Sequence, residues 1–453
     1  YYCPQLPFGG DEDYIWSLDG KKVLYVTKAK VGTDYVLSTN TDIYEYDLTS
    51  KKTTNLTEGM MGYDTNPQYS KEGVLAWLSM AHNGNESDKN DLYILKNGKH
   101  INLTAQWDNT IFSYRWSNDG KRIYLIAPTQ GTEQLFVVDV YSKNTTPIQL
   151  TQGVFDVNSI VGQAGDQLVV IRTDTNHAAE LYTINLKEKK KEYLSLTQLS
   201  HFNDEQYKQI AQCPIKERII KTTDGKDMHA WVIYPPDFDP NKKYPTLLYC
   251  QGGPQSIVSQ FYSFRWNFQL MASQGYIVIA PNRRGLPGFG VEWNAQISGD
   301  WGGQPMRDYL SAIDDIAKEP YVDKDRLGAV GASYGGYSIY YLAGIHQKRF
   351  KTFIAHCGVF NLESMYGTTE ELFFNNNEIG GAYWEERNAV AQKSYKEFNP
   401  IKKINNWDTP ILIIHGGKDY RVPEEQGFQA FTAAQLKGIK SELLYFPDEN
   451  HWV

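Results

Sequence analysis

The sequence has few cysteines and no long apolar run. Its four cysteines, Cys3, Cys213, Cys250 and Cys357, lie far apart in the chain. Such spacing excludes a dense disulfide framework and the close cysteine pairs of structural zinc sites. Cys250 and Cys357 fall in apolar segments, so we expect them to be small core residues. No apolar stretch approaches the roughly 18 residues of a membrane-spanning helix, so no membrane span is predicted.

The sequence also lacks concentrated basic charge. The 453-residue chain carries a formal net charge of −8, and its main basic cluster is the lysine-rich run at residues 187–191. This run lies between strand-like segments, and we interpret it as a solvated turn rather than a nucleic-acid patch. We therefore expect no nucleic-acid partner. The length predicts two or three domains with large cores.

Residues 1–205 contain a repeat. Each copy of the repeat closes with a polar residue, a leucine and a threonine, and the copies are 46 or 47 residues apart: Asn55-Leu56-Thr57, Asn102-Leu103-Thr104, Gln149-Leu150-Thr151 and Ser195-Leu196-Thr197. Turns such as residues 16–20 and 116–120 open strands with alternating apolar residues. Short strands with a period of about 45 residues are typical of propeller blades, and a β-solenoid or β-sandwich is the alternative.

The repeat and the chain ends together predict a domain plan. We expect residues 1–205 to be a partial β-propeller of about four blades, truncated at its N-terminal side, because a closed propeller usually has more blades. We expect residues 206–453 to be a catalytic domain without its C-terminal helix, because the chain stops two residues after His451. The chain has no initial Met and no targeting segment, so a signal peptide upstream remains compatible with the sequence.

Residues 206–453 alternate between strand-like and helix-like segments. Residues 218–223 and 228–234 are predicted to form an antiparallel pair around Asp224-Gly225. The expected parallel strands are residues 246–250, 276–280, 327–331, 352–356, 411–415 and 442–446, and the expected helices include residues 261–273, 306–318, 337–347 and 424–436. This alternation predicts an α/β fold with a mostly parallel eight-stranded sheet and functional loops at the carboxyl ends of its strands.

A candidate nucleophile lies between a predicted strand and a predicted helix. Gly331-Ala332-Ser333-Tyr334-Gly335 fits the pattern G-x-S-x-G, directly after the apolar run at residues 326–330. In an α/β-hydrolase this turn raises the serine oxygen above the sheet, and small flanking residues let the turn close. The pentapeptide alone would be weak evidence, but its strand and helix context favours a nucleophile elbow over a chance turn.

The partners of such a serine follow in the order that the α/β-hydrolase fold requires. Asp419 ends the turn after the strand at residues 411–415, and His451 lies in the loop after residues 442–446. Ser333 would attack a carbonyl, His451 would transfer the proton, and Asp419 would hold the imidazole. Alone, Asp419 would be interpreted as an Asx turn and His451 as a surface histidine. Their combined spacing favours a catalytic triad.

The blade repeat followed by this hydrolase pattern resembles the prolyl oligopeptidase family of serine peptidases over essentially the whole chain. The motifs that carry the resemblance are residues 331–337 and 417–423, together with residues 249–256 and 282–290, which are most similar to the family's bacterial dipeptidyl peptidases. The resemblance implies release of dipeptides from free amino termini, with small or hydrophobic residues at the second position. It also implies oligopeptide substrates, a periplasmic or secreted location, and a homodimer.

The resemblance and the fold suggest further site residues. The backbone N–H of Tyr334 is the expected first oxyanion donor. Where family members often carry a tyrosine, this chain has Gln251, so either its amide or an N–H of the loop at residues 252–254 would be the second donor. The resemblance assigns Phe360 and Val422, with Tyr334, to the pocket for the residue before the scissile bond, and Tyr366 is added by proximity.

Three further groups of residues each allow two interpretations, one functional and one structural. The resemblance assigns Arg421 to a substrate carbonyl, and a surface ion pair with Glu424 or Glu425 is the alternative. His356 and His415 end apolar strands near the site, and we expect hydrogen-bonded structural histidines. We interpret Glu370, Glu371 and the asparagines at 375–377 as a solvated loop rather than a metal site. The chemistry requires neither a metal nor an organic cofactor.

Three function classes follow from these patterns. The favoured class is a serine peptidase that releases dipeptides. The second is an acylaminoacyl peptidase or endo-acting oligopeptidase of the same family, which would differ in what binds the amino end of the substrate. The third is a silent binding protein whose propeller docks a partner, and the intact set of Ser333, Asp419 and His451 disfavours it.

Overall fold

The computed structural model describes residues 2–4, 9–188 and 192–453, so the lysines at 189–191 lie outside the described residues. The chain divides into two compact units. The first runs to Asp204 and includes the short segments Ser259–Phe261 and Gly288–Val291. The second comprises Glu205–Val258, Tyr262–Pro287 and Glu292–Val453.

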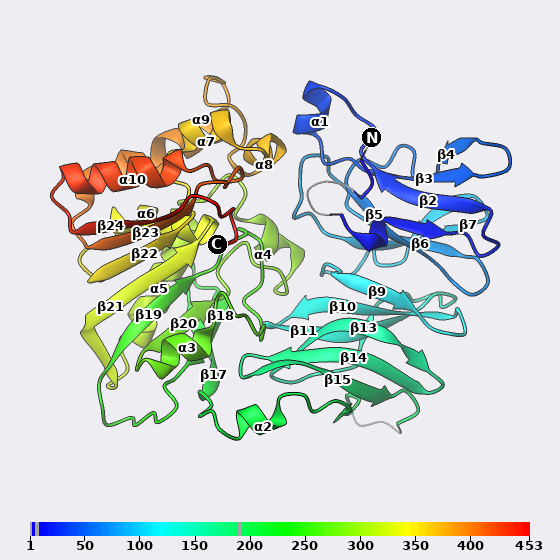
Figure 1. The fold of residues 1–453 in the computed structure, drawn as a ribbon, viewed down its shortest axis with the longest axis horizontal. Helices are drawn as coiled ribbons and strands as arrows, with labels where there is room; N and C mark the ends of the chain where they lie inside the picture. Colours follow the sequence, from blue (N-terminus) through cyan, green and yellow to red (C-terminus); the bar gives the residue numbers. More distant parts are fainter. Residues whose placement is uncertain (1, 5–8, 189–191) are drawn as a thin grey trace. The chain divides into compact units, whose positions relative to one another are not determined.

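The first unit contains four antiparallel sheets of four strands each, drawn in blue to green in Figure 1. Within each sheet the strands are adjacent in the order of the sequence. The sheets are β1–β4 (Tyr14–Trp16, Lys22–Thr27, Asp42–Asp47, Thr53–Asn55), β5–β8 (Asp64–Tyr69, Leu75–Ser79, Asp91–Lys96, Lys99–Asn102), β9–β12 (Ser113–Trp116, Arg122–Thr129, Thr132–Asp139, Ile148–Gln149) and β13–β16 (Asp156–Ala164, Gln167–Asp174, His177–Asn185, Leu196–Gln198). The short helical segments are η1 (Asp11–Asp13), α1 (Thr33–Leu37) and α2 (Asp204–Tyr207). The predicted propeller-like repeat is confirmed.

Consecutive sheets bury apolar residues between their faces. In β10, Leu125 belongs to the core shared with the sheet before it, whereas Tyr124 and Ile126 belong to the core shared with the sheet after it. This alternation follows from the two-residue period of a strand. A similar core joins Leu24 and Ile43 of the first sheet to residues of β6. Each sheet is therefore stabilised by its neighbours in the sequence.

The repeated tripeptide closes the first three sheets through hydrogen bonds to the third strand of each. The Thr104 hydroxyl accepts from the backbone N–H of Leu92 at 3.0 Å and donates to Asp91 at 2.7 Å, while the Leu103 N–H donates to the Leu92 carbonyl at 2.8 Å. The same arrangement occurs around Thr57 with Ile43 and Asp42, and around Thr151 with Leu135 and Gln134. The repeated tripeptide therefore fastens the chain after the fourth strand to the third strand of the same sheet, and we call this set of hydrogen bonds the closure.

The fourth copy of the closure is Gln198-Leu199-Ser200, not the predicted Ser195-Leu196-Thr197. The Ser200 hydroxyl accepts from the Leu181 N–H at 2.8 Å and donates to Glu180, and the Leu199 N–H donates to the Leu181 carbonyl at 2.8 Å. The prediction was wrong by three residues because both segments place a hydroxyl residue after a leucine. Only the hydrogen bonds to β15 distinguish them.

The second unit is built on an eight-stranded sheet with the order β17-β18-β20-β19-β21-β22-β23-β24. Its strands are β17 (Ile215–Lys221), β18 (Asp227–Ile233), β19 (Tyr244–Cys250), β20 (Ile277–Pro281), β21 (Val322–Ala332), β22 (Thr352–His356), β23 (Ile411–Gly416) and β24 (Ser441–Phe446). β17 and β18 are antiparallel to their neighbours and the other pairs are parallel. The predicted, mostly parallel α/β-hydrolase sheet is confirmed.

Several helices differ from their predicted bounds. The helices of the second part of the chain are α3 (Phe268–Ser273), α4 (Val291–Ala295), α5 (Gln304–Ile316), α6 (Tyr334–Ala343), α7 (Leu362–Thr368), α8 (Leu372–Glu378), α9 (Ala389–Glu397), η2 (Pro400–Asn406) and α10 (Glu425–Leu436). α3 starts later than predicted because the Asn267 side chain accepts from the Leu270 N–H and caps it. The predicted solvated loop around Glu371 is wrong, because α8 follows it at once and Glu371 is buried.

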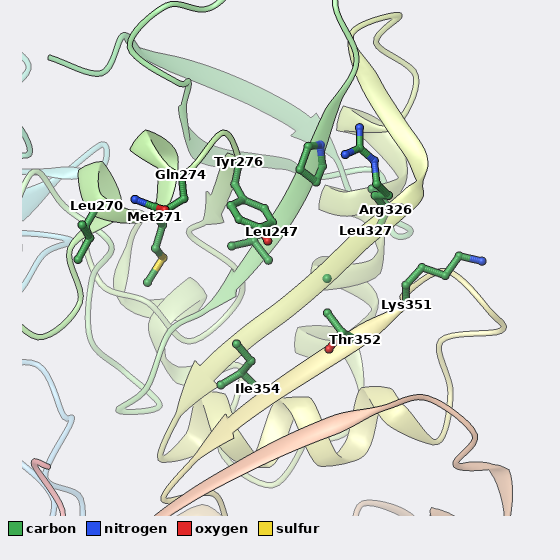
Figure 2. A pocket seen from close by; sticks show the side chains of 12 residues that line it. Leu247, Leu270, Met271, Gln274, Tyr276, Arg326, Leu327, Lys351, Thr352 and Ile354 are labelled. Carbon is green, nitrogen blue, oxygen red and sulfur yellow. The ribbon is translucent and has the colours of Figure 1, made fainter. Parts of the chain in front are cut away.

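An apolar cavity of about 560 Å³ lies against β19, β21, β22 and α3 (Figure 2). Leu247, Met271, Leu327 and Ile354 are among the 12 residues that line it, and these differ from all the predicted site residues. The cavity is therefore separate from the candidate active site. Among the described residues, no helix is both long and apolar enough to cross a membrane.

Candidate active site

Ser333 occupies a strained turn between β21 and α6. Its backbone has φ 60° and ψ −119°, and left-handed φ values are uncommon for residues other than glycine. The Ser333 N–H donates to the His356 carbonyl at 2.9 Å, and its own carbonyl accepts from Tyr337 in the first turn of α6. These bonds on both sides hold the turn in its strained conformation.

Glycines make the close packing of this turn possible. A Cβ atom added to Gly331 would lie 2.7 Å from the Cys250 carbonyl oxygen, and one added to Gly335 would collide with the same oxygen. The pattern G-x-S-x-G therefore has a steric cause in this chain. Helix α6 can start directly above β19 only if both positions lack a side chain.

Asp419 uses its two carboxylate oxygens for different purposes. One oxygen accepts from the backbone N–H groups of Arg421 and Val422 at 3.0 and 2.8 Å, which is the Asx turn considered as the alternative. The other oxygen lies 2.6 Å from Nδ1 of His451. Both side chains are buried. The turn therefore holds the carboxylate in the position that orients the imidazole.

Ser333, Asp419 and His451 follow β21, β23 and β24, whose carboxyl ends share one edge of the sheet. Among the described side chains, the hydrogen bond that joins members of this set is the one between His451 and Asp419. Catalytic hydrogen bonds to a nucleophile are often long before substrate binds. The arrangement provides a nucleophile, a base and a carboxylate that orients the base.

Two further histidines lie behind the carboxylate and stay neutral. Nε2 of His415 is 2.8 Å from the Val422 carbonyl oxygen and 3.8 Å from Asp419, and burial lowers the pKa of His415. Burial, reinforced by the nearby Arg265, lowers the pKa of His356 to about 4. Neutral neighbours leave the Asp419 charge available to an imidazolium at His451.

Cys357, His415 and Asp419 are the described residues that could together hold a metal ion. Asp419 already accepts three hydrogen bonds, and Nε2 of His415 already bonds the Val422 carbonyl. Burial raises the pKa of the Cys357 thiol, which keeps it protonated. We therefore interpret the three residues as packing around the triad carboxylate.

Sequence reasoning missed Arg265, which contacts the histidine loop. Its guanidinium donates to the backbone carbonyls of His451 and Val453, each at 3.0 Å, and lies 3.4 Å from Nδ1 of His356. Arg265 lies three residues before the start of α3 and far from His451 in the sequence. Because its partners are mainly backbone carbonyls, no side-chain pattern in the sequence could indicate this role.

Gln251, the predicted side-chain donor to the oxyanion, is held by other groups. Its amide oxygen accepts from the Tyr249 hydroxyl at 2.7 Å, and its amide nitrogen is 3.4 Å from the Ile257 carbonyl oxygen. The next residue, Gly252, lies against the nucleophile, because a Cβ atom on it would be 3.6 Å from the Ser333 Cβ. The glycine loop is thus the part of this segment nearest Ser333.

The predicted pocket residues lie in different surroundings. Phe360 is fully buried, and its ring packs edge-on against Tyr340 and Trp407. Tyr366 donates to Asn376 and contacts the exposed ring of Trp384.

Val422 is also buried, and its backbone N–H donates to Asp419. The hydroxyl of Tyr334, the residue after Ser333, donates to the Trp301 carbonyl. Among the pocket candidates, Tyr366 packs beside an exposed aromatic side chain, whereas Phe360 packs in the core.

Arg421 is paired, but not with the predicted partners. Its guanidinium lies 2.9 Å from Glu371 and 3.4 Å from Glu370, and it stacks over the Trp452 ring at 4.7 Å. The expected alternative of a surface ion pair with Glu424 or Glu425 is wrong because the acidic pair before α8 is closer. Burial raises the pKa of Glu371 to about 7, and Arg421 opposes this shift.

The fold is that of an α/β-hydrolase with a propeller-like unit, and its sheet edge carries Ser333 together with the bonded pair of His451 and Asp419. Residues 262–453 match the model of the prolyl oligopeptidase family, and residues 79–225 match that of the dipeptidyl peptidase IV N-terminal region. The hydrolase part of the chain therefore belongs to the prolyl oligopeptidase family.

Individual relatives agree with this assignment. The chain is 50% identical to dipeptidyl-peptidase 5 of Porphyromonas gingivalis over all of its own length and 65% of that protein, and 32% identical to dipeptidyl-peptidase 5 of Schizosaccharomyces pombe over 99% of its length and 64% of that protein. It therefore spans slightly less than two thirds of these relatives.

Solved structures share the fold at low sequence identity. Pyrococcus horikoshii acylaminoacyl peptidase has a TM-score of 0.82 at 21% identity, with 97% of this chain and 66% of that chain covered. Porphyromonas gingivalis dipeptidyl peptidase 4 has a TM-score of 0.71 at 20% identity, with 95% and 59% covered.

Proposed function

We propose that this protein is a serine peptidase that releases dipeptides from free amino termini, with small or hydrophobic residues at the second position. The observation that carries the proposal is the 2.6 Å contact between His451 and Asp419 at the sheet edge that also presents the strained Ser333. The 50% identity to a dipeptidyl-peptidase 5 supports the choice of substrate.

In the proposed reaction, Ser333 attacks the carbonyl of the second residue while His451 accepts its proton. Asp419 stabilises the imidazolium, and the N–H groups of Tyr334 and the glycine loop bind the oxyanion. His451 then returns the proton to the leaving amine, which leaves the dipeptidyl group bound to Ser333 as an ester. Water, activated by His451, hydrolyses this ester and releases the dipeptide. We include Val422, Tyr366 and Phe360 in the pocket proposal, and Arg421 as a group that binds a substrate carbonyl.

Two assays test this function. A fluorophosphonate probe should label wild-type protein at Ser333, and dipeptide amides with a free amino terminus should be cleaved much faster than the same amides with a blocked terminus. Preference for blocked termini would instead indicate an acylaminoacyl peptidase, and cleavage within long peptides an oligopeptidase. Absence of labelling would contradict the serine mechanism itself.

We also propose a periplasmic or secreted location and a homodimer, supported by the family resemblance. Fractionation of producing cells tests the location, and recovery of the protein only with cytoplasmic markers would contradict it. Light scattering during size-exclusion chromatography tests the dimer, and a mass near the 51.8 kDa of one chain would contradict it.

A further inference from the structure

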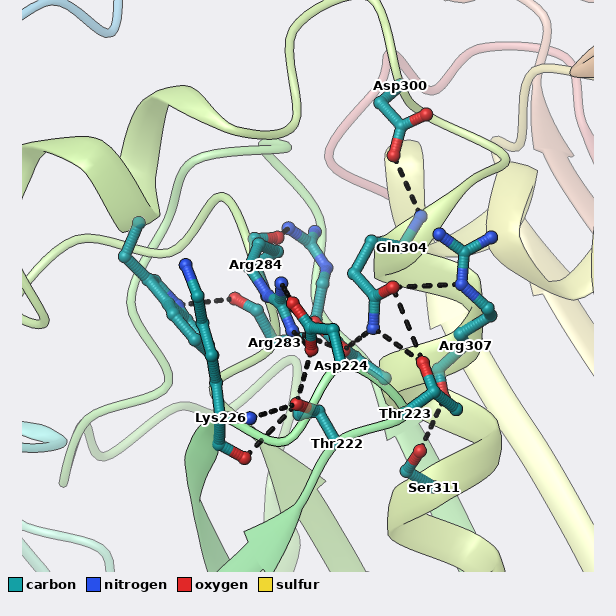
Figure 3. A network of polar contacts seen from close by, with 12 residues as sticks. Thr222, Thr223, Asp224, Lys226, Arg283, Arg284, Asp300, Gln304, Arg307 and Ser311 are labelled. Atoms are coloured by element: carbon teal, nitrogen blue, oxygen red, sulfur yellow. Dashed lines mark hydrogen bonds and ion pairs between the residues drawn. The ribbon is translucent and has the colours of Figure 1, made fainter.

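Two adjacent arginines after β20 have opposite environments (Figure 3). Arg284 forms ion pairs with Asp224 at 2.6 Å and with Asp308 at 3.1 Å. Arg283 is fully buried, yet within the described part of the chain no carboxylate forms an ion pair with it. A buried charge without a countercharge is costly, so its partners need an explanation.

Arg283 donates two of its hydrogen bonds to carbonyl groups of the loop that follows β19 and a third, at 2.7 Å, to the Arg284 carbonyl. Its guanidinium donates to the carbonyl oxygens of Gln251 at 3.2 Å and Pro254 at 2.9 Å, which are the two ends of the glycine loop. Its Nε donates to the Tyr309 hydroxyl at 3.0 Å, and that hydroxyl in turn donates to the Gln251 carbonyl at 3.4 Å. The planar fork of donors therefore fixes both ends of the loop at once.

The same guanidinium contacts the residue after the nucleophile. It lies over the Tyr334 ring, 4.5 Å from the ring centre. The N–H of Tyr334 is one proposed oxyanion donor, and the glycine loop, which approaches Ser333 at Gly252, supplies the other. Arg283 thus touches both segments that would bind the oxyanion.

We propose that Arg283 is a positioning residue that holds the two oxyanion-binding segments together and supplies the positive potential beneath them. This inference rests on the proposed serine hydrolase chemistry. Negative charge develops on the substrate oxygen only in the transition state, so a fixed, unpaired cation nearby stabilises that state more than the bound substrate. Such a role also explains why the charge is left without a carboxylate partner.

The test compares Arg283→Met with Arg284→Met in the full chain. A peptidyl boronic acid is the probe, because its adduct with the serine places a negatively charged oxygen in the oxyanion site. We expect Arg283→Met to lower kcat and boronic acid affinity by about 100-fold each while KM changes little, as for loss of an oxyanion donor. Arg284→Met should lower thermal stability and leave boronic acid affinity within about threefold, since the hydrogen bonds of the Arg284 side chain in the described residues go to Asp224 and Asp308.

Folded Arg283→Met protein with wild-type boronic acid affinity would overturn the inference, as would an equal loss of affinity in Arg284→Met. If Arg283→Met does not fold, Tyr309→Phe replaces it, because this change removes one acceptor of Arg283 and one donor to Gln251. Tyr309→Phe should weaken boronic acid binding about tenfold, and unchanged binding would overturn the inference. If wild-type protein neither binds the boronic acid nor reacts with the fluorophosphonate, the proposed function itself fails.

Discussion

In the propeller-like unit one hydrogen-bonded closure occurs four times, whereas in the hydrolase unit the contacts that build the candidate site differ from one residue to the next. Each closure places a hydroxyl two residues after the fourth strand of a sheet, where it accepts from a backbone N–H of the third strand. The hydroxyls belong to Thr57, Thr104, Thr151 and Ser200. By contrast, Ser333 is held by backbone hydrogen bonds, Asp419 by an Asx turn and by His451, and Arg283 by carbonyl groups and a tyrosine hydroxyl.

We therefore expect substitutions in the closures to affect mainly stability and substitutions in the triad to affect mainly activity. A lost closure should weaken one sheet while the other three keep theirs, so the effect is graded and confined to stability. A lost contact at the triad should have a large effect on activity and, where the side chain is not packed, little effect on stability. The following changes test this contrast, beginning with the largest expected effect.

Ser333→Ala should lower turnover by at least about 10⁴-fold, because removal of a triad member leaves only binding and oxyanion stabilisation. It should also abolish labelling by a fluorophosphonate probe. The midpoints of thermal unfolding should change little, since the hydroxyl is not part of the core. Labelling of the alanine variant at wild-type rate would contradict the assignment.

Phe360→Ala should lower the stability of the hydrolase unit by about 3–5 kcal/mol, the usual cost of deleting a buried aromatic ring. The reason is its complete burial against Tyr340 and Trp407. Hydrogen exchange that resolves the two units is the measurement, with the propeller-like unit as internal control. Relative rates on substrates with Ala, Leu and Val at the second position then test the pocket role, which unchanged ratios would eliminate.

Arg421→Ala should lower kcat/KM on dipeptide amides by about 1.5–3 kcal/mol, the range for hydrogen bonds to charged groups. The guanidinium is held by Glu370, Glu371 and the Trp452 ring, which fixes the plane of its donors, and a planar fork in a fixed position suits a substrate carbonyl. Arg421→Lys is the matched control, since it keeps the charge without the planar fork. If the alanine variant kept the wild-type kcat/KM, the ion pair of Arg421 would be purely structural and the proposed contact with a substrate carbonyl would be wrong.

Thr104→Val should destabilise the propeller-like unit by about 1–3 kcal/mol, because the Leu92 N–H and the Asp91 carboxylate both lose a partner. The rate of fluorophosphonate labelling should not change. Thr54→Val, at an exposed position in β4, is the control and should have almost no effect. If the Thr104→Val variant were as stable as the control variant, the closure would contribute nothing to the free energy of unfolding of the propeller-like unit.

Asp64→Asn should stabilise the propeller-like unit by an amount that grows with pH. Burial raises the pKa of Asp64 from 3.8 to about 7, so the folded state holds a proton that the unfolded state loses. Wild-type stability therefore falls as pH rises from about 4 to 7, whereas the amide is insensitive. We expect a gain of about 1–3 kcal/mol at pH 8 and nearly none at pH 4, measured by calorimetry. A pH-independent difference would contradict the titration.

The sequence predicted the elements with strong periodicity and failed where local patterns were ambiguous. Short stretches of the sequence were enough to predict the four sheets and the parallel strands. They were also enough to predict the order of Ser333, Asp419 and His451. The fourth closure was misplaced because Leu196-Thr197 and Leu199-Ser200 carry the same pattern. Helix α8 was missed because its asparagine-rich sequence has low helix propensity and depends on burial of Phe373 and Phe374.

The supporting contacts of the site were not predictable for a different reason. Arg265 and Arg283 bind mostly backbone carbonyls, and every residue type offers the same carbonyl group. Their partners lie in other loops, so no spacing in the sequence connects donor with acceptor. Only the folded sheet, which gathers these loops at one edge, shows which arginine serves which segment.

The self-contained closures have a consequence for how such a chain can grow or be rearranged. A segment cut after Thr57 and again after Thr104 carries its own strands and the hydroxyl that fastens them. Duplication or exchange of the segment between those two positions would transfer one four-stranded sheet together with its closing hydroxyl. A cut a few residues earlier would separate that hydroxyl from its sheet. Viable recombination points in this half of the chain should therefore cluster just beyond each threonine or serine.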